Sequence, residues 1–149
     1  MKFSQQQSGF TLAEIIIVIT IISFVTIISL PFYRNLNFNL SLSGQTKELA
    51  SDLRQAQQLA VTEQINYQVI IDQEHNSYAI INTQTLKKIK EKKLKNQITI
   101  LAINGLINNT VEFNATGAAI SPGNIILTNP NLRQATIEIK PSGYVKIGN

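Results

Sequence analysis

The pattern of apolar and polar residues begins with one long hydrophobic segment. From Phe10 to Leu30 almost every residue is apolar, and Glu14 is the only charged side chain between Phe10 and Tyr33. A helix of this length would extend about 31 Å, and the hydrocarbon core of a bilayer is about 30 Å thick. The many Ile, Val and Thr residues favour strands in water, but a single segment in lipid must satisfy its own backbone hydrogen bonds. The pattern therefore predicts a membrane-spanning helix over residues 10–33.

The next stretch, residues 34–64, contains two different periodicities. The sequence NLNFNLSLS, residues 35–43, alternates polar and apolar residues as a strand does. From residue 46 onward the apolar side chains recur at the spacing of one helical face, at Leu49, Leu53, Ala56 and Ala60. We therefore expect an amphipathic helix that packs on a sheet, preceded by a weaker stretch around Gly44.

The remaining residues, 65–149, contain short strand-like runs separated by Gly, Pro, Asn and Ser. The first two runs, YQVIID and YAIIN, are joined by QEHNS and indicate a hairpin. The later runs are QITILAI, TVEFN, NIILTN, ATIEIK and YVKIG. One helix followed by about seven short strands indicates an α+β fold, with an antiparallel sheet packed on the helix.

Three hypotheses account for the apolar segment and its carboxylate. A secretory signal peptide has an apolar run of about 7–15 residues and a small-x-small exit, whereas this run is longer and leaves through SLPFYRN. A plain signal anchor would hold Glu14 near the membrane edge, where a charge costs less than at the bilayer centre. The third hypothesis rests on the residues that flank Glu14.

The sequence SGFTLAEIIIVITII, which begins at Ser8, resembles the N-terminus of type IV prepilins and type II secretion pseudopilins. The resemblance implies that residues 1–9 are a leader, which a prepilin peptidase removes on the cytoplasmic side by cleaving between Gly9 and Phe10. It also implies that the new amine of Phe10 is N-methylated and that Glu14 is the signature acid. Pro31 lies where many pilins carry proline. The resemblance further implies that the N-terminal helix continues through residues 35–43.

Cleavage would give Phe10 a positive α-amino group in surroundings that solvate charge poorly. The carboxylate of Glu14 in one subunit could then pair with the terminal ammonium of a neighbouring subunit. A paired charge costs far less than an isolated one at low dielectric. We therefore expect Glu14 to control assembly into a filament.

The C-terminal part is similar to the GspH/FimT group of minor pseudopilins. The similarity lies in EFNATGAAISPGNIILTN and LRQATIEIKPSGYVKI, at Phe113, Gly117, Gly123, Ile125, Leu127, Pro141, Gly143 and Val145. It implies a minor subunit of a type II secretion pseudopilus or type IV pilus. The implied partners are other pilins or pseudopilins, an inner-membrane assembly platform and, before assembly, the lipid bilayer. The implied location is the inner membrane, crossed once, with the C-terminal domain in the periplasm.

The charge pattern raises a second possibility. The net charge is a mild +4, but the run KKIKEKKLK concentrates six lysines: Lys87, Lys88, Lys90, Lys92, Lys93 and Lys95. Such a run could bind phosphates in a salt-dependent way, or it could be a solvated strand edge that discourages pairing with other chains. The run contains no aromatic residue on which bases could stack.

Some FimT-like subunits bind DNA during uptake and carry a GRxR-like motif before the last strands. Here the corresponding residues, 132–135, keep Arg133 but lack the glycine and the second arginine. Arg133, Lys140 and Lys146 could join the lysine run in a basic patch. A DNA-binding minor pilin is therefore the alternative function.

The sequence gives little reason to expect an enzyme, a cofactor or a metal site. It contains no cysteine, which excludes disulfides and thiol chemistry within this sequence. His75 is the only histidine and lies in a predicted turn beside Asp72 and Glu74. The acids show no paired-carboxylate signature, and no phosphate-binding glycine loop is present. A membrane-anchored enzyme is the least supported class.

Overall fold

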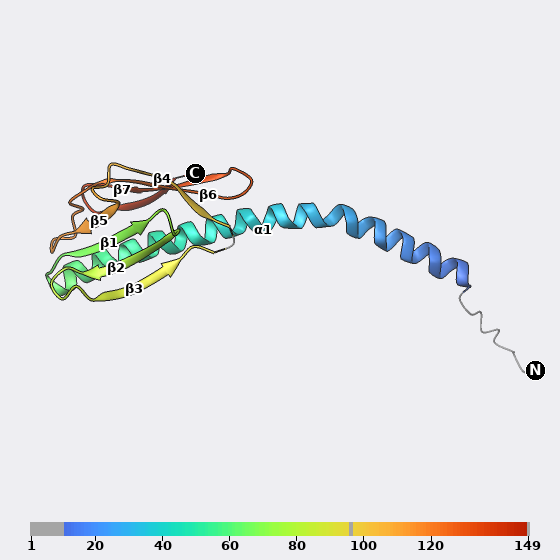
Figure 1. Cartoon of the computed structure of the whole chain (residues 1–149), viewed down its shortest axis with the longest axis horizontal. Helices are drawn as coiled ribbons and strands as arrows, with labels where there is room; N and C mark the ends of the chain where they lie inside the picture. The colour runs from blue at the N-terminus through green and yellow to red at the C-terminus, as the bar shows by residue number, and fades with distance from the viewer. Residues whose placement is uncertain (1–10, 96, 149) are drawn as a thin grey trace, which may run out of the picture. The chain divides into compact units, whose positions relative to one another are not determined.

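The structure is a computed structural model that describes residues 11–95 and 97–148 (Figure 1). The predicted leader and the cleavage residues Gly9 and Phe10 lie outside the described residues. The chain forms two compact units, Met1–Leu36 and Asn37–Asn149. Each unit is described separately below.

The helix α1, Leu12–Glu63, contains 52 residues and continues from the first unit into the second. Its first part is long and apolar enough to cross a membrane, and that part is not buried against the rest of the structure. Four hydroxyl groups in it donate to the carbonyl four residues earlier, at distances of 2.7–2.9 Å; they belong to Thr20, Ser23, Thr26 and Ser29. All four hydroxyl donors in this apolar segment are therefore satisfied within the helix.

Residues 35–43 are helical, which confirms the expectation drawn from the family resemblance. Their strand-like alternation does not determine their structure, because helix on both sides lets the backbone bonds continue through them. Once a helix is nucleated, each added residue gains a hydrogen bond without a new nucleation cost. Gly44 is also inside the helix.

The strands form two antiparallel sheets of four. The first has the order β3-β2-β1-β5 and consists of β1 (Tyr67–Asp72), β2 (Ser77–Asn82), β3 (Lys88–Lys93) and β5 (Thr110–Phe113). The second has the order β4-β6-β7-β8 and consists of β4 (Thr99–Asn104), β6 (Gly123–Thr128), β7 (Gln134–Ile139) and β8 (Val145–Gly148). The predicted antiparallel α+β fold is confirmed, but the strands divide between two sheets. The lysine run adds one strand, β3, to the seven expected.

One hydrophobic core joins both sheets to the second half of α1. The predicted helical face is confirmed, since Leu49, Leu53, Ala56 and Ala60 are all 0% exposed. The sheets contribute further fully buried side chains: Val69, Ile80, Val111, Phe113, Ile125, Leu127 and Ile137. Figure 1 shows β1, β2 and β3 running alongside this part of the helix.

Two glycines allow a close contact between α1 and two turns. Gly117 has φ +84° and Gly143 has φ +81°, a backbone region that other residues rarely adopt. A Cβ atom on Gly143 would lie 1.9 Å from the carbonyl oxygen of Gly117. The side chain of Gln57 donates to that same oxygen at 2.8 Å. A side chain at position 143 therefore has no space, and one at position 117 would be strained by the backbone conformation and would lie 2.9 Å from the side chain of Val61.

Candidate functional site

The first turn of α1 is closed by Thr11 and Glu14. The backbone N–H and the hydroxyl of Thr11 donate to Glu14 Oε2 at 2.9 and 3.0 Å, and the N–H of Glu14 donates to Thr11 Oγ1 at 3.3 Å. This is a capping box, in which the two residues satisfy each other's backbone donors. A carboxylate in this position also interacts favourably with the helix dipole.

The capping box uses only one of the two carboxylate oxygens. Within residues 11–95 and 97–148, Oε1 of Glu14 accepts no hydrogen bond. Thr11 directly follows Phe10, the predicted new N-terminal residue, so Glu14 is four residues from the predicted new amine in the sequence. The geometry can therefore hold the carboxylate in place while one oxygen remains available to a cation.

A second polar cluster lies between α1 and β3. Asp52 is 4% exposed, and its carboxylate accepts from Lys90 Nζ at 2.6 Å and from the hydroxyl of Tyr78 at 2.7 Å. Lys92 forms an ion pair with Glu48 and lies 3.9 Å from Asp52. The cluster attaches an edge strand to the helix through charged side chains.

This cluster changes how two of its members titrate. Burial, and then the hydrogen bond to Asp52, raises the pKa of Tyr78 far above its usual value. The hydrogen bond to Glu48 raises the pKa of Lys92. Sequence reasoning missed Asp52 as a buried group, because its partners are 26 and 38 residues away in the sequence.

Three of the six lysines in the run are therefore engaged in ion pairs. Lys90 and Lys92 pair with the helix, and Lys88 pairs with Glu91 at 2.9 Å on the exposed strand. Lys87, Lys93 and Lys95 are exposed and make no ion pair with any residue that the structure describes. Lys87 lies in the β2–β3 turn, at the opposite end of β3 from Lys93.

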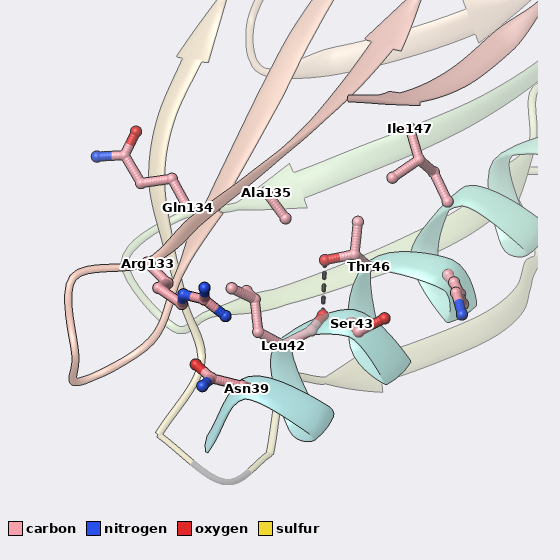
Figure 2. A pocket seen from close by; sticks show the side chains of 9 residues that line it. Asn39, Leu42, Ser43, Thr46, Arg133, Gln134, Ala135 and Ile147 are labelled. Atoms are coloured by element: carbon pink, nitrogen blue, oxygen red, sulfur yellow. Dashed lines mark hydrogen bonds between the residues drawn. The ribbon is translucent and has the colours of Figure 1, made fainter. Parts of the chain in front are cut away.

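Two shallow grooves lie beside α1 near the start of the second unit. Figure 2 shows the first, of about 370 Å³, lined by Asn39, Leu42, Ser43, Thr46, Lys47, Arg133, Gln134, Ala135 and Ile147. The second, of about 570 Å³, is lined by Ser41, Gly44, Gln45, Glu48, Glu91, Lys92, Lys93 and Lys95. Four exposed cations of these grooves form no ion pair with a described residue, and we call them the basic end: Lys47, Lys93, Lys95 and Arg133. Lys47 was not singled out in the sequence.

The other two predicted basic residues lie elsewhere. Lys140 accompanies Gly143 in the β7–β8 turn, which contacts the helix at Gln57. Gln57 is 18 residues beyond Asn39, about 27 Å along a helix. Lys146 is exposed on β8, opposite Glu138 of β7. The predicted basic residues are thus spread over both ends of the second unit.

His75 lies in the predicted turn, where its Nδ1 is 2.8 Å from Asp72. Hydrogen bonds from the backbone N–H and the ring of His75 lower the pKa of Asp72. Among residues 11–95 and 97–148, no group of three or more metal-ligating side chains comes together.

Two family models match the chain. Residues 4–30 match the prokaryotic N-terminal methylation motif, and residues 45–143 match the model described as type II transport protein GspH. No curated protein sequence matches the chain significantly.

Two groups of solved structures have a similar fold. The type IV minor pilin FimU of Pseudomonas aeruginosa strain PAO1 has a TM-score of 0.63 and 11% identity, over 74% of this chain and 90% of that one. The minor pseudopilin EpsH from the type 2 secretion system of Vibrio cholerae has a TM-score of 0.61 and 10% identity, over 72% of this chain and 95% of that one. At these identities the similarity concerns the fold.

Proposed function

The chain belongs to the family of type II transport protein GspH, and from this premise we propose that it is a minor structural subunit of a type II secretion pseudopilus or type IV pilus. One observation carries the proposal. A single helix, α1, contains both the apolar segment with Glu14 and the buried face that packs against the sheets of the second unit, Asn37–Asn149, which we call the β unit. Such a helix can anchor the subunit in lipid and later pack against the helices of other subunits.

Maturation forms the second part of the proposal. The methylation motif covers Gly9, Phe10 and Glu14. A prepilin peptidase would cleave between Gly9 and Phe10, and the new amine would be methylated. Oε1 of Glu14 would then accept a hydrogen bond from the terminal ammonium group of a neighbouring subunit, while Oε2 stays with Thr11. This pairing would favour the filament over the isolated subunit in the bilayer.

The same helix supports a proposed location. Before assembly the subunit would cross the inner membrane once through residues 10–33, with its β unit in the periplasm. Its partners would be the prepilin peptidase, the assembly platform and other pilins or pseudopilins. No catalytic step is required for this role.

The mature N-terminus tests the proposal. The chain is expressed together with a prepilin peptidase and analysed by intact mass spectrometry. We expect a protein that begins at Phe10 and carries one added methyl group. The matched control is a Gly9→Leu variant, which should keep Met1 or Lys2 at its N-terminus and the full leader. A wild-type chain that keeps its leader under these conditions would contradict maturation.

DNA binding is the alternative function. Fewer cations are available to contact phosphates than the sequence indicated. Lys88, Lys90 and Lys92 are engaged in ion pairs, and Arg133 and Lys140 flank opposite ends of β7. A salt-titrated gel shift with the full chain in detergent tests this alternative. Absence of a shift at low salt would exclude it, whereas a steep fall in affinity with salt would support phosphate contacts.

A further inference from the structure

We propose that the basic end is a membrane-docking surface, which holds the β unit against anionic lipid headgroups while the subunit is still in the bilayer. The inference rests on the proposed anchoring of residues 10–33. Three observations support it. Cations at this end form no ion pair with a described residue, a leucine side chain is exposed beside them, and a hydrogen-bonded loop holds that leucine next to an arginine.

The loop between β6 and β7 is held in a defined shape by Asn129. This side chain is 2% exposed, and its Oδ1 accepts from the N–H groups of Asn131 and Arg133, both at 3.0 Å. Its Nδ2 donates to the side chain of Asn39 on the helix at 3.0 Å. The loop is thus attached to α1 only two residues after the second unit begins.

The residues that this loop presents suit a membrane surface. Leu132 is 83% exposed and has φ +60°, a conformation that the surrounding hydrogen bonds maintain. Arg133 follows it and lines the groove beside the helix (Figure 2). Leu40, on the helix in the same region, is 63% exposed. Leucine beside arginine is the combination found on surfaces that enter the headgroup layer.

The second connection at this end supplies two more cations. The backbone of Lys95 is held by Gln45, whose side chain accepts from the Lys95 N–H at 3.0 Å and donates to the Lys95 carbonyl. Lys93 lines the same groove. Of the acids in that groove, Glu48 is paired with Lys92 and Glu91 with Lys88.

The remaining acids nearby are in the β1–β2 turn. Asp72 is engaged with His75, and Glu74 is exposed. Both line a different hollow, together with Asn108 and Asn109, and neither lines the grooves of the basic end. Positive charge therefore predominates where the chain enters the second unit.

The length of the chain permits these cations to reach the headgroups. Asn39 is six residues beyond Tyr33, where the proposed span ends, which is about 9 Å along a helix. Gln45 is twelve residues beyond it, about 18 Å. The headgroup layer extends about 7 Å outward from the hydrocarbon, and the Debye length is about 8 Å at physiological salt. Counted along the chain, Asn39 lies within the combined reach of these two layers and Gln45 lies a few ångströms beyond it, so the length of the chain permits contact between the basic end and an anionic surface.

The test measures the distance from the basic end to the lipid in the full chain. The natural sequence has no cysteine, so a fluorophore can be attached uniquely at Asn131→Cys in the exposed loop. The labelled protein is placed in nanodiscs of phosphatidylcholine, with or without phosphatidylglycerol, that contain a headgroup-attached quencher. Ser142→Cys, in the β7–β8 turn, provides the distant control label.

Two triple variants carry the same change in charge. The first, Lys93→Gln, Lys95→Gln and Arg133→Gln, removes cations of the basic end. The second, Lys87→Gln, Lys140→Gln and Lys146→Gln, removes exposed cations elsewhere. We expect phosphatidylglycerol to increase quenching at position 131 but not at 142. A cation near an anionic surface contributes a factor of about five, so the first triple should lower the docked fraction by at least about tenfold and the second should not.

Three results would overturn the inference. One is equal quenching at position 131 in neutral and anionic discs, in protein that is retained in the discs. Another is that both triple variants lower the docked fraction by the same factor. The third is that the first triple abolishes binding of double-stranded DNA while quenching is unchanged, which would assign the surface to DNA. Failure of the chain to be retained in any disc would instead disprove the proposed anchoring, and the inference with it.

Discussion

Thr11 and Glu14 are joined by three hydrogen bonds that close the first turn of α1. The only charged side chain of the apolar segment therefore caps the helix of its own chain. This adds a second role to the one inferred from the sequence, where Glu14 was considered only as a partner for a neighbouring amine. Substitutions at this position can separate the two roles.

Glu14→Val should prevent incorporation into a filament while membrane insertion is retained. Glu14→Gln keeps an oxygen that can accept from Thr11 but removes the charge. If the charge is required for pairing with a neighbouring amine, both variants should reduce incorporation by more than about tenfold. Sheared pilus or pseudopilus fractions, compared with membrane fractions by immunoblot, provide the measurement.

The two variants also show which outcome would refute charge pairing. Assembly of Glu14→Gln at the wild-type level, with loss for Glu14→Val alone, would assign the residue to capping. Normal assembly of Glu14→Val would contradict both roles.

Asp52→Ala should destabilise the β unit, because it leaves the cation of Lys90 and the buried hydroxyl of Tyr78 without their partner. We expect the free energy of unfolding to fall by about 2–4 kcal/mol. The control is Glu91→Ala, which breaks the exposed pair with Lys88 and should change it by less than about 0.5 kcal/mol. Urea unfolding in detergent, followed by near-UV circular dichroism, measures both. Equal effects would show that the buried cluster does not stabilise the fold.

Gly143→Ala should be strongly destabilising, by about 3 kcal/mol or more, because it combines backbone strain with a clash. The clash is with the carbonyl oxygen of Gly117, which is part of the backbone and has little freedom to move. Gly44→Ala is the matched substitution in open space, since nothing lies within 4 Å of its added Cβ. The Gly44→Ala substitution should stabilise α1 by up to about 1 kcal/mol. The same unfolding assay compares them, and a loss of stability at Gly44 would indicate a requirement for flexibility there.

Tyr78→Phe should weaken the dependence of stability on alkaline pH. Because the pKa of Tyr78 is raised in the folded chain, the folded state holds this proton more tightly than the unfolded state. Its contribution to stability is complete below about pH 10 and is lost as the pH rises above that value. The pKa of Lys92 is also raised, so its contribution to stability is lost at alkaline pH as well. Lys92 is present in both the wild type and Tyr78→Phe, and its effect is common to both.

At neutral pH the loss of this hydrogen bond should cost about 1–2 kcal/mol. Above pH 10 the stabilities of the wild type and Tyr78→Phe should converge. Unfolding measured at several pH values between neutral and strongly alkaline provides the test. A constant difference over this range would show that Tyr78 does not titrate differently in the folded chain.

Local patterns in the sequence predicted much of the fold. The spacing of Leu49, Leu53, Ala56 and Ala60 depends only on the helix repeat, and all four are buried as expected. The predicted first strand has the bounds of β1, because alternation and flanking turn residues define it locally. For residues 35–43, in contrast, the alternation indicated the wrong structure, and the resemblance to pilins gave the right one.

Features that depend on distant partners could not be predicted in this way. β3 contains mostly lysine and lacks an apolar alternation, and it is a strand because its backbone pairs with β2 and two of its lysines pair with the helix. The division into two sheets depends on which strands pair, which no local pattern contains. The basic end likewise combines residues from the helix and two separate connections. Lys93, Lys95 and Arg133 were predicted as basic candidates without their arrangement, and Lys47 was missed.

The continuity of α1 also has a mechanical consequence. A force that draws the apolar segment out of the bilayer would travel along the helix backbone to Leu49 and Leu53, at the centre of the core. Since β1, β2 and β3 run alongside this part of the helix (Figure 1), the load would act in shear on many contacts at once. Contacts loaded in this direction share the force, so a pull on the apolar segment would not separate them one at a time.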